Sequence, residues 1–176
     1  MNKEDLIRIL QRIDEEVWLV IGRRDPKPRV VIVGGAAFML RDLTPRKITH
    51  DIDVYEVDEA IRAILGMYPE VNRAVAAYAD QIPYNFEDRL VVIDVGAKAI
   101  EFTAPCVEDM VVMKLYAERP SDIQDIDGAV SAGEIDWDLL EQLVYSDDEA
   151  AASALSTRRY EEMKSAFERM KERCGR

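Results

Sequence analysis

The first twenty residues carry apolar side chains every three or four positions, as one face of a helix does. These positions are Leu6, Leu10, Ile13 and Val17. Mostly charged residues lie between them, so the helix would pack against a core along one face and expose the other to water. The pattern therefore predicts an amphipathic helix of about five turns that ends near Gly22.

Two strands and a short helix are predicted in the next part of the chain. The run from Val30 to Val33 consists of four β-branched residues, which favour a buried strand, and Gly34-Gly35 ends it. Residues 36–40 are predicted to form a short helix directly after the glycines. Residues 51–57 alternate between polar and apolar side chains, which is typical of a half-buried strand.

The rest of the chain is predicted to be mainly helical. Helices are expected over residues 58–67, 69–79, 107–118, from 120 onward, 136–145 and 149–173. A hairpin of two strands is expected at 90–95 and 99–103. Because strands mixed with helices are followed by helices alone, the order indicates an α+β fold. We expect an α/β domain over residues 1–130 and a helical C-terminal extension, residues 131–176, packed on it.

Composition narrows the class of protein. The 176 residues are 48% hydrophobic, which is enough for a core without disulfide bonds, and the two cysteines are expected to be reduced thiols. Lys and Arg number 23 against 35 Asp and Glu, a net charge of -12, which argues against a protein that binds along a nucleic-acid backbone. No apolar run approaches the roughly 18 residues of a membrane span, and no signal peptide is recognised. We expect a cytoplasmic protein without a membrane partner.

The chemistry is concentrated between residues 30 and 57. Paired glycines after a strand let the backbone approach a bulky anion, and the helix that follows offers unpaired N–H groups. Asp51 and Asp53 are two residues apart on a strand, so both carboxylates point to the same face. Carboxylates placed in this way can hold divalent ions. Thr49 has the same parity, so its hydroxyl is expected on that face too.

This stretch resembles the nucleotidyltransferase fold of the DNA polymerase β superfamily, in which a buried strand, Gly-Gly, a helix and an Asp-x-Asp strand follow one another. The most similar members are small bacterial nucleotidyltransferase-like proteins and abortive-infection toxins. In them a basic residue and a threonine precede the Asp pair, and here Lys47 and Thr49 fit those places. Residues 107–126, which include Lys114, match a second motif of these relatives. The resemblance implies a mixed sheet flanked by helices.

The resemblance also implies a reaction, the transfer of a nucleoside monophosphate from a nucleoside triphosphate to an acceptor hydroxyl. Asp51 and Asp53 would bind Mg²⁺, with two ions expected. The implied nucleotide-binding residues are Gly34, Gly35, Lys47, Thr49 and Lys114. The acceptor would be tRNA or protein, and a toxin role with an antitoxin partner is among the expectations. The four basic residues between positions 23 and 29 are a candidate contact for an RNA acceptor.

Members of the superfamily use a third carboxylate on a neighbouring strand. Asp94, in the predicted strand 90–95, is the favoured candidate for this catalytic role, and Glu101 is the rival. If neither residue serves, the protein would be a weak or inactive enzyme. The alternative function is therefore a catalytically inactive module on the same fold that binds a nucleotide or a partner.

Overall fold

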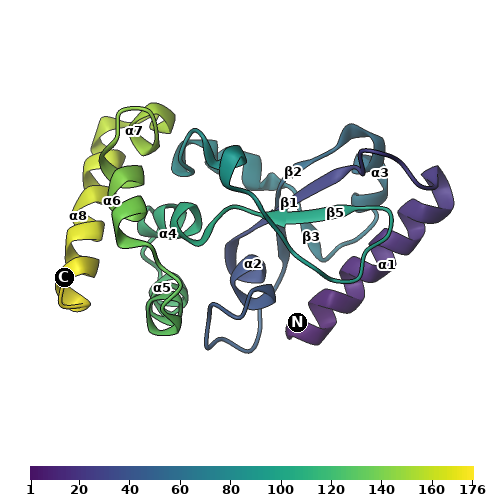
Figure 1. Cartoon of the computed structure of the whole chain (residues 1–176), viewed down its shortest axis with the longest axis horizontal. Coiled ribbons are helices and arrows are strands. Elements are labelled where there is room, and N and C mark those ends of the chain that lie inside the picture. The colour runs from purple at the N-terminus through teal and green to yellow at the C-terminus, as the bar shows by residue number, and fades with distance from the viewer. The chain divides into compact units, whose positions relative to one another are not determined.

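A computed structural model describes the backbone of residues 1–176 and all side chains except those of Ala76 and Ala77 (Figure 1). The chain forms two compact units. Unit 1 contains Met1–Asp42, Arg46–Ala76 and Leu90–Ala104, and unit 2 contains Leu43–Pro45, Ala77–Arg89 and Pro105–Arg176. Residues 105–130 thus belong with the C-terminal helices, so the division lies earlier in the chain than the predicted boundary after residue 130.

Unit 1 is built on a mixed sheet of five strands. The strands are β1 (Arg29–Val33), β2 (Ile52–Val57), β3 (Val71–Asn72), β4 (Val91–Val92) and β5 (Glu101–Ala104). Their order in the sheet is β3-β2-β1-β5-β4. Strand β1 runs antiparallel to β2 and parallel to β5, so the glycines that follow β1 lie at the central strand. The predicted α+β class and the mixed sheet are confirmed.

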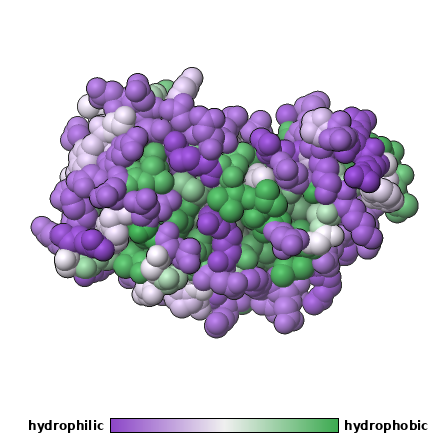
Figure 2. Space-filling view, viewed as in Figure 1, coloured by the Kyte–Doolittle hydropathy of each residue, from purple (hydrophilic) through white to green (hydrophobic). Residues whose placement is uncertain are grey.

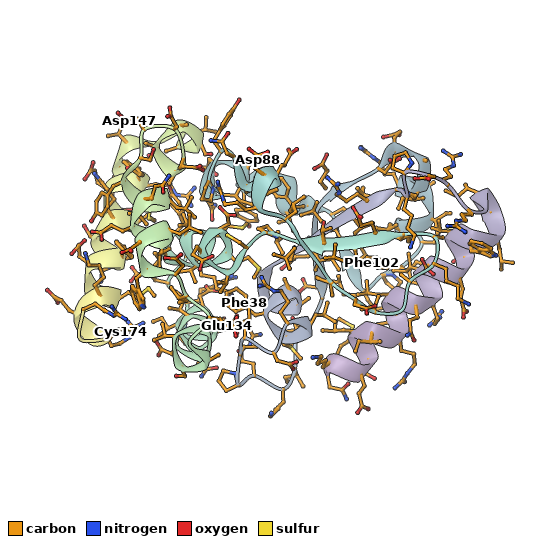
Figure 3. All side chains as sticks on the ribbon, in the orientation of Figure 1. Phe38, Asp88, Phe102, Glu134, Asp147 and Cys174 are labelled. Carbon is orange, nitrogen blue, oxygen red and sulfur yellow. The ribbon has the colours of Figure 1, made fainter. Side chains whose placement is uncertain are left out.

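The helices of unit 1 follow the predicted pattern. They are α1 (Lys3–Ile21), α2 (Gly34–Leu40) and α3 (Arg62–Leu65), the last preceded by the 3-10 turn η1 (Glu59–Ile61). Asn2 caps the start of α1 and Gly22 ends the helix, which buries the predicted apolar face. The core includes Phe38 on α2 and Phe102 on β5, both almost completely buried (Figure 3).

A buried aspartate ties α1 to the loop before β5. Asp14 is 4% exposed, and its carboxylate accepts hydrogen bonds from the backbone N–H groups of Lys98, Ala99 and Ile100 at 2.7, 2.8 and 2.8 Å. Because these amides are bonded to Asp14, they do not join the sheet. The strand predicted over 99–103 therefore begins only at Glu101.

Replacing Asp14 by alanine is expected to lower the free energy of unfolding by about 3 kcal/mol, because it leaves three N–H groups without their acceptor. Urea denaturation would measure the loss as a shift of the midpoint. Glu15→Ala, on the exposed side of the same turn, serves as the control and should change the value by less than about 0.5 kcal/mol. An unchanged midpoint for Asp14→Ala would contradict the anchoring role.

Residues 69–79 depart from the predicted helix. Val71 and Asn72 instead form β3, which pairs in parallel with Ile52 and Asp53 of β2, and the 3-10 helix η2 (Ala74–Gln81) follows. The open edge of β2 offers hydrogen-bonding groups to this segment, as the bond from the Ile52 N–H to the Glu70 carbonyl oxygen shows. Pairing across the sheet therefore outweighs the local helical preference here.

Unit 2 is helical. It contains the 3-10 turn η3 (Phe86–Arg89) and the helices α4 (Val107–Leu115), α5 (Pro120–Ala132), α6 (Trp137–Tyr145), α7 (Ala150–Ser153) and α8 (Thr157–Arg173). The predicted last helix is thus divided in two. Helix α8 buries Phe167 and exposes charged residues, and Figure 2 shows its end of the view as hydrophilic. Within the part of the chain that the structure describes, no helix has the length and apolar character needed to cross a membrane.

Candidate active site

The turn from β1 into α2 lies directly against an acidic side chain. Gly34, the first residue after β1, has a positive φ of 66°. A Cβ atom at this position would lie only 2.5 Å from the Oδ2 atom of Asp53, closer than Cβ atoms approach non-bonded atoms in proteins. Asp53 is the residue paired with Val33 across the β1–β2 ladder, which explains the approach. The positive φ favours glycine here, and a side chain would also force the Asp53 carboxylate to move.

Asp53 lies on the predicted face of β2, and Asp51 directly precedes the strand. Ile52 and Val54 are buried with 0% and 2% exposure, so the alternation directs Asp53 to the other side; both aspartates are half-buried. Asn72 of β3 donates a hydrogen bond from its side-chain nitrogen to the Oδ1 atom of Asp53 at 2.8 Å. Among the residues that the structure describes, none forms a hydrogen bond or ion pair with the carboxylate of Asp51.

A basic side chain lies beside the second glycine. A Cβ atom at Gly35 would lie 3.0 Å from the Nη1 atom of Arg46 and 3.5 Å from the Oγ1 atom of Thr49. Arg46 is half-buried and Thr49 is 6% exposed, with its hydroxyl donating to the Asp51 carbonyl oxygen at 3.3 Å. The structure thus places Asp53 beside Gly34, and Arg46 and Thr49 beside Gly35.

The basic residue at this turn differs from the predicted one. Lys47, chosen because its spacing from the Asp pair matches the superfamily motif, is exposed, whereas its neighbour Arg46 reaches Gly35. The sequence does show two adjacent cations at these positions. It does not show which of the two side chains turns back toward the glycines, because the segment 44–51 has no regular secondary structure whose periodicity would decide this.

Glu101 lies at the other end of the sheet. It is the residue paired with Arg29 at the start of β1, and the Arg29 Nε atom contacts its carboxylate at 3.1 Å. Asp53 is paired with Val33 at the end of β1. Four residues of extended strand separate the two ends by about 13 Å. The structure therefore does not bring Glu101 to the carboxylate pair.

Asp94 also lies at that far end. The N–H of Ile93 donates a hydrogen bond to the carbonyl oxygen of Phe102 at 2.8 Å. This continues the antiparallel register of β4 and β5, so Asp94 lies opposite Glu101, beyond the end of β4. Its side chain is exposed and accepts a hydrogen bond from the Gly96 N–H at 2.9 Å. The strand predicted over 90–95 is only two residues long, and Asp94 serves as the acceptor in the following turn. The structure thus brings neither candidate for the third carboxylate to Asp51 and Asp53.

The loop that carries the basic residues between positions 23 and 29 lies at the same end of the sheet as Asp94 and Glu101. It runs into Arg29, the first residue of β1, whereas the glycines follow the last residue of that strand. Lys27 donates to the carbonyl oxygen of Ala97 at 3.3 Å, which holds the loop to the far end of the sheet. The candidate RNA contact is therefore separated from the glycine turn by the length of β1.

Lys114 belongs to unit 2, where it is buried between two aspartates. Its Nζ atom lies 2.6 Å from Asp125 and 3.0 Å from Asp122, and all three side chains are at most 7% exposed. The Thr44 hydroxyl donates to Asp125 at 2.6 Å. Burial would raise the pKa of the Asp122 carboxyl, but the hydrogen bonds from Arg119 and the charge of Lys114 outweigh it and hold this pKa below its usual value. A nucleotide-binding role for Lys114 stays a prediction.

Unit 1 thus combines, at one end of β1, a glycine turn, two carboxylates and a guanidinium group. Among the described residues, no group of three or more His, Cys, Asp or Glu side chains is placed to hold a metal ion. No curated protein and no solved structure shows significant similarity to the chain. A family model does match residues 8–174. The chain belongs to this family, which is described as nucleotidyltransferase of unknown function (DUF6036).

Proposed function

We propose that the protein is a metal-dependent nucleotidyltransferase that transfers a nucleoside monophosphate from a nucleoside triphosphate to an acceptor hydroxyl. Membership of the family supports the reaction class. The observation that carries the proposal is the close approach of the glycine turn to Asp53, one of the two carboxylates, where a Cβ at Gly34 would meet Asp53 at 2.5 Å. The start of α2 thus adjoins a carboxylate suited to a cation and a guanidinium suited to a phosphate. A metal–triphosphate complex needs both at one place.

The donor set fits Mg²⁺. This ion prefers oxygen ligands and is commonly bound through one or two carboxylates together with substrate phosphates and water. Asp51 and Asp53 would supply the carboxylates, and the hydrogen bond from Asn72 fixes the orientation of Asp53. When bound, one or two Mg²⁺ ions would neutralise the triphosphate and lower the pKa of the attacking hydroxyl.

The chain's own groups would position the nucleotide. The first N–H groups of a helix have no acceptor within it, so the backbone at Gly34 and Gly35 can donate to phosphate oxygens. The absence of side chains at both positions leaves room for the Asp53 carboxylate and the Arg46 guanidinium, which would flank a bound phosphate chain. Lys114 is proposed as a further cation, on the strength of the resemblance alone. The same holds for a tRNA or protein acceptor and for a toxin role with an antitoxin partner.

A second candidate function is an inactive module that binds a nucleotide or a partner on the same fold. The observation that favours it is the position of Asp94 and Glu101, at the end of the sheet opposite the pair Asp51 and Asp53. Neither candidate for the third carboxylate is therefore placed to accept the proton of an acceptor hydroxyl bound at the pair. The module would bind a nucleoside triphosphate and leave it intact.

Radiolabelled nucleotides separate these functions. The protein is incubated with Mg²⁺, cell extract and each nucleoside triphosphate carrying ³²P at either the α- or the γ-position. We expect α-label to appear on an acceptor only when Mg²⁺ is present, so that EDTA abolishes transfer, and γ-label to remain in small molecules. Nucleotide binding without transfer would support the inactive module. A protein that neither binds nor transfers any of the nucleotides would contradict both functions.

A further inference from the structure

We infer that the exposed end of α1 and the start of the basic loop after it form a binding surface for another protein, one that presents carboxylates beside apolar side chains. We call this surface the α1 tip. It consists of Trp18, Leu19, Val20, Arg23 and Arg24. All five residues belong to unit 1, and none of them is part of the candidate active site. The inference is therefore independent of the proposed function.

Three consecutive apolar side chains at the end of α1 are exposed to water. The exposed fractions are 42% for Trp18, 83% for Leu19 and 65% for Val20. Leu19 continues the exposed face of the helix, on which Glu15 and Arg12 lie one and two turns earlier, so a charged side chain is expected at this position. Figure 2 shows hydrophobic surface at the right-hand edge of the view, where α1 ends in Figure 1. Adjacent exposed apolar side chains, unlike scattered ones, indicate an interaction site.

Two arginines directly after the helix add positive charge to this surface. Arg23 and Arg24 are exposed, and neither forms an ion pair or a side-chain hydrogen bond with any residue that the structure describes. Lys27 adds a third cation, whose Nζ atom donates to the carbonyl oxygen of Ala97, and Asp25 is the one carboxylate in the loop. The loop is therefore positive within a chain whose net charge is -12. Its charge is complementary to carboxylates on a partner.

The combination of side chains favours a protein partner over RNA or a membrane. Tryptophan and arginine are among the residues that contribute most to binding energy at protein interfaces. An RNA backbone would bind the arginines but would leave Leu19 and Val20 without apolar contacts. A membrane with anionic lipids would repel a chain with a net charge of -12. Carboxylates beside apolar side chains, as on an acidic amphipathic helix, would contact both parts of the α1 tip.

The test selects peptides that bind the full chain from a displayed library of short random sequences. We expect the most enriched sequence to combine Asp or Glu with large apolar residues. Synthesised with a fluorophore, this peptide should bind at least about tenfold more weakly to each of the variants Leu19→Ser, Arg23→Glu and Arg24→Glu. The controls are Met67→Ser, at an apolar side chain 61% exposed, and Arg8→Glu, at an exposed cation of α1. Both should bind the peptide within about twofold of wild type.

Other probes and outcomes decide against the inference. We expect Arg23→Glu to leave unchanged any binding of a single-stranded RNA oligonucleotide, or of phosphatidylcholine vesicles that contain phosphatidylserine, at physiological salt. Loss of such binding in this variant would assign the surface to RNA or to a membrane and overturn the inference. Recovery of no binding peptide would also overturn it, as would a peptide whose affinity is unchanged either in Leu19→Ser or in both arginine variants. Thermal melting verifies that each variant is folded.

Discussion

The double variant Asp51→Asn, Asp53→Asn is expected to lose nucleotidyl transfer by at least about 10³-fold. Asparagine keeps the size of the side chain and one oxygen donor but removes the negative charge that holds Mg²⁺. The loss would appear in the transfer of α-³²P label to the acceptor at saturating Mg²⁺. Each single variant should retain less than about a tenth of the activity, because either carboxylate alone binds the ion more weakly.

Glu56 on the same strand supplies the control for this prediction. It is exposed and pairs with Val31, away from the glycine turn. Glu56→Gln therefore removes one negative charge from β2 without touching the proposed site, and its transfer rate should stay within about twofold of wild type. Full activity in a folded Asp51→Asn, Asp53→Asn variant would rule out the proposed mechanism.

Periodicity and short motifs predicted the elements that position the candidate site. The apolar spacing of α1, the β-branched run of β1 and the alternation of β2 each depend on which face an element buries, which is a local property of the sequence. The same alternation placed Asp51 and Asp53 on one face. The glycines were identified because paired glycines after a strand let the backbone approach a bulky anion, and Gly34 does have a positive φ.

The features that the sequence did not predict depend on contacts between distant segments. Asp94 was predicted to lie within a strand. In the pairing of β4 with β5, however, this residue lies at the end of the sheet opposite Asp51 and Asp53. The register of a strand depends on the strand it pairs with, which can lie far away in the sequence. The residues 90–95 alone therefore do not predict it. The sequence did not identify Asn72 as a site residue, because β3 is only two residues long and forms only by pairing with β2. The position of Arg46 likewise depends on how an irregular loop folds back.

Lys114→Met is expected to lower the free energy of unfolding by about 4 kcal/mol. Methionine has a similar shape, but it removes the cation that lies 2.6 Å from Asp125 and 3.0 Å from Asp122. Loss of one partner from a buried ion pair leaves an uncompensated buried charge, which is strongly destabilising. Urea denaturation at pH 7 would measure the effect. Lys164→Met, which breaks the surface pair with Glu161, serves as the control and should cost less than about 1 kcal/mol.

The dependence of this loss on pH follows from the lowered pKa of Asp122. A carboxyl whose pKa is lower in the folded than in the unfolded state stabilises the fold above the unfolded value, about 4, and loses this contribution as the pH falls through the folded value. The difference in stability between wild type and Lys114→Met should therefore shrink below about pH 4. If Lys114→Met instead kept its stability and lost nucleotide binding, the predicted contact of Lys114 with phosphate would outweigh its role in the ion pairs.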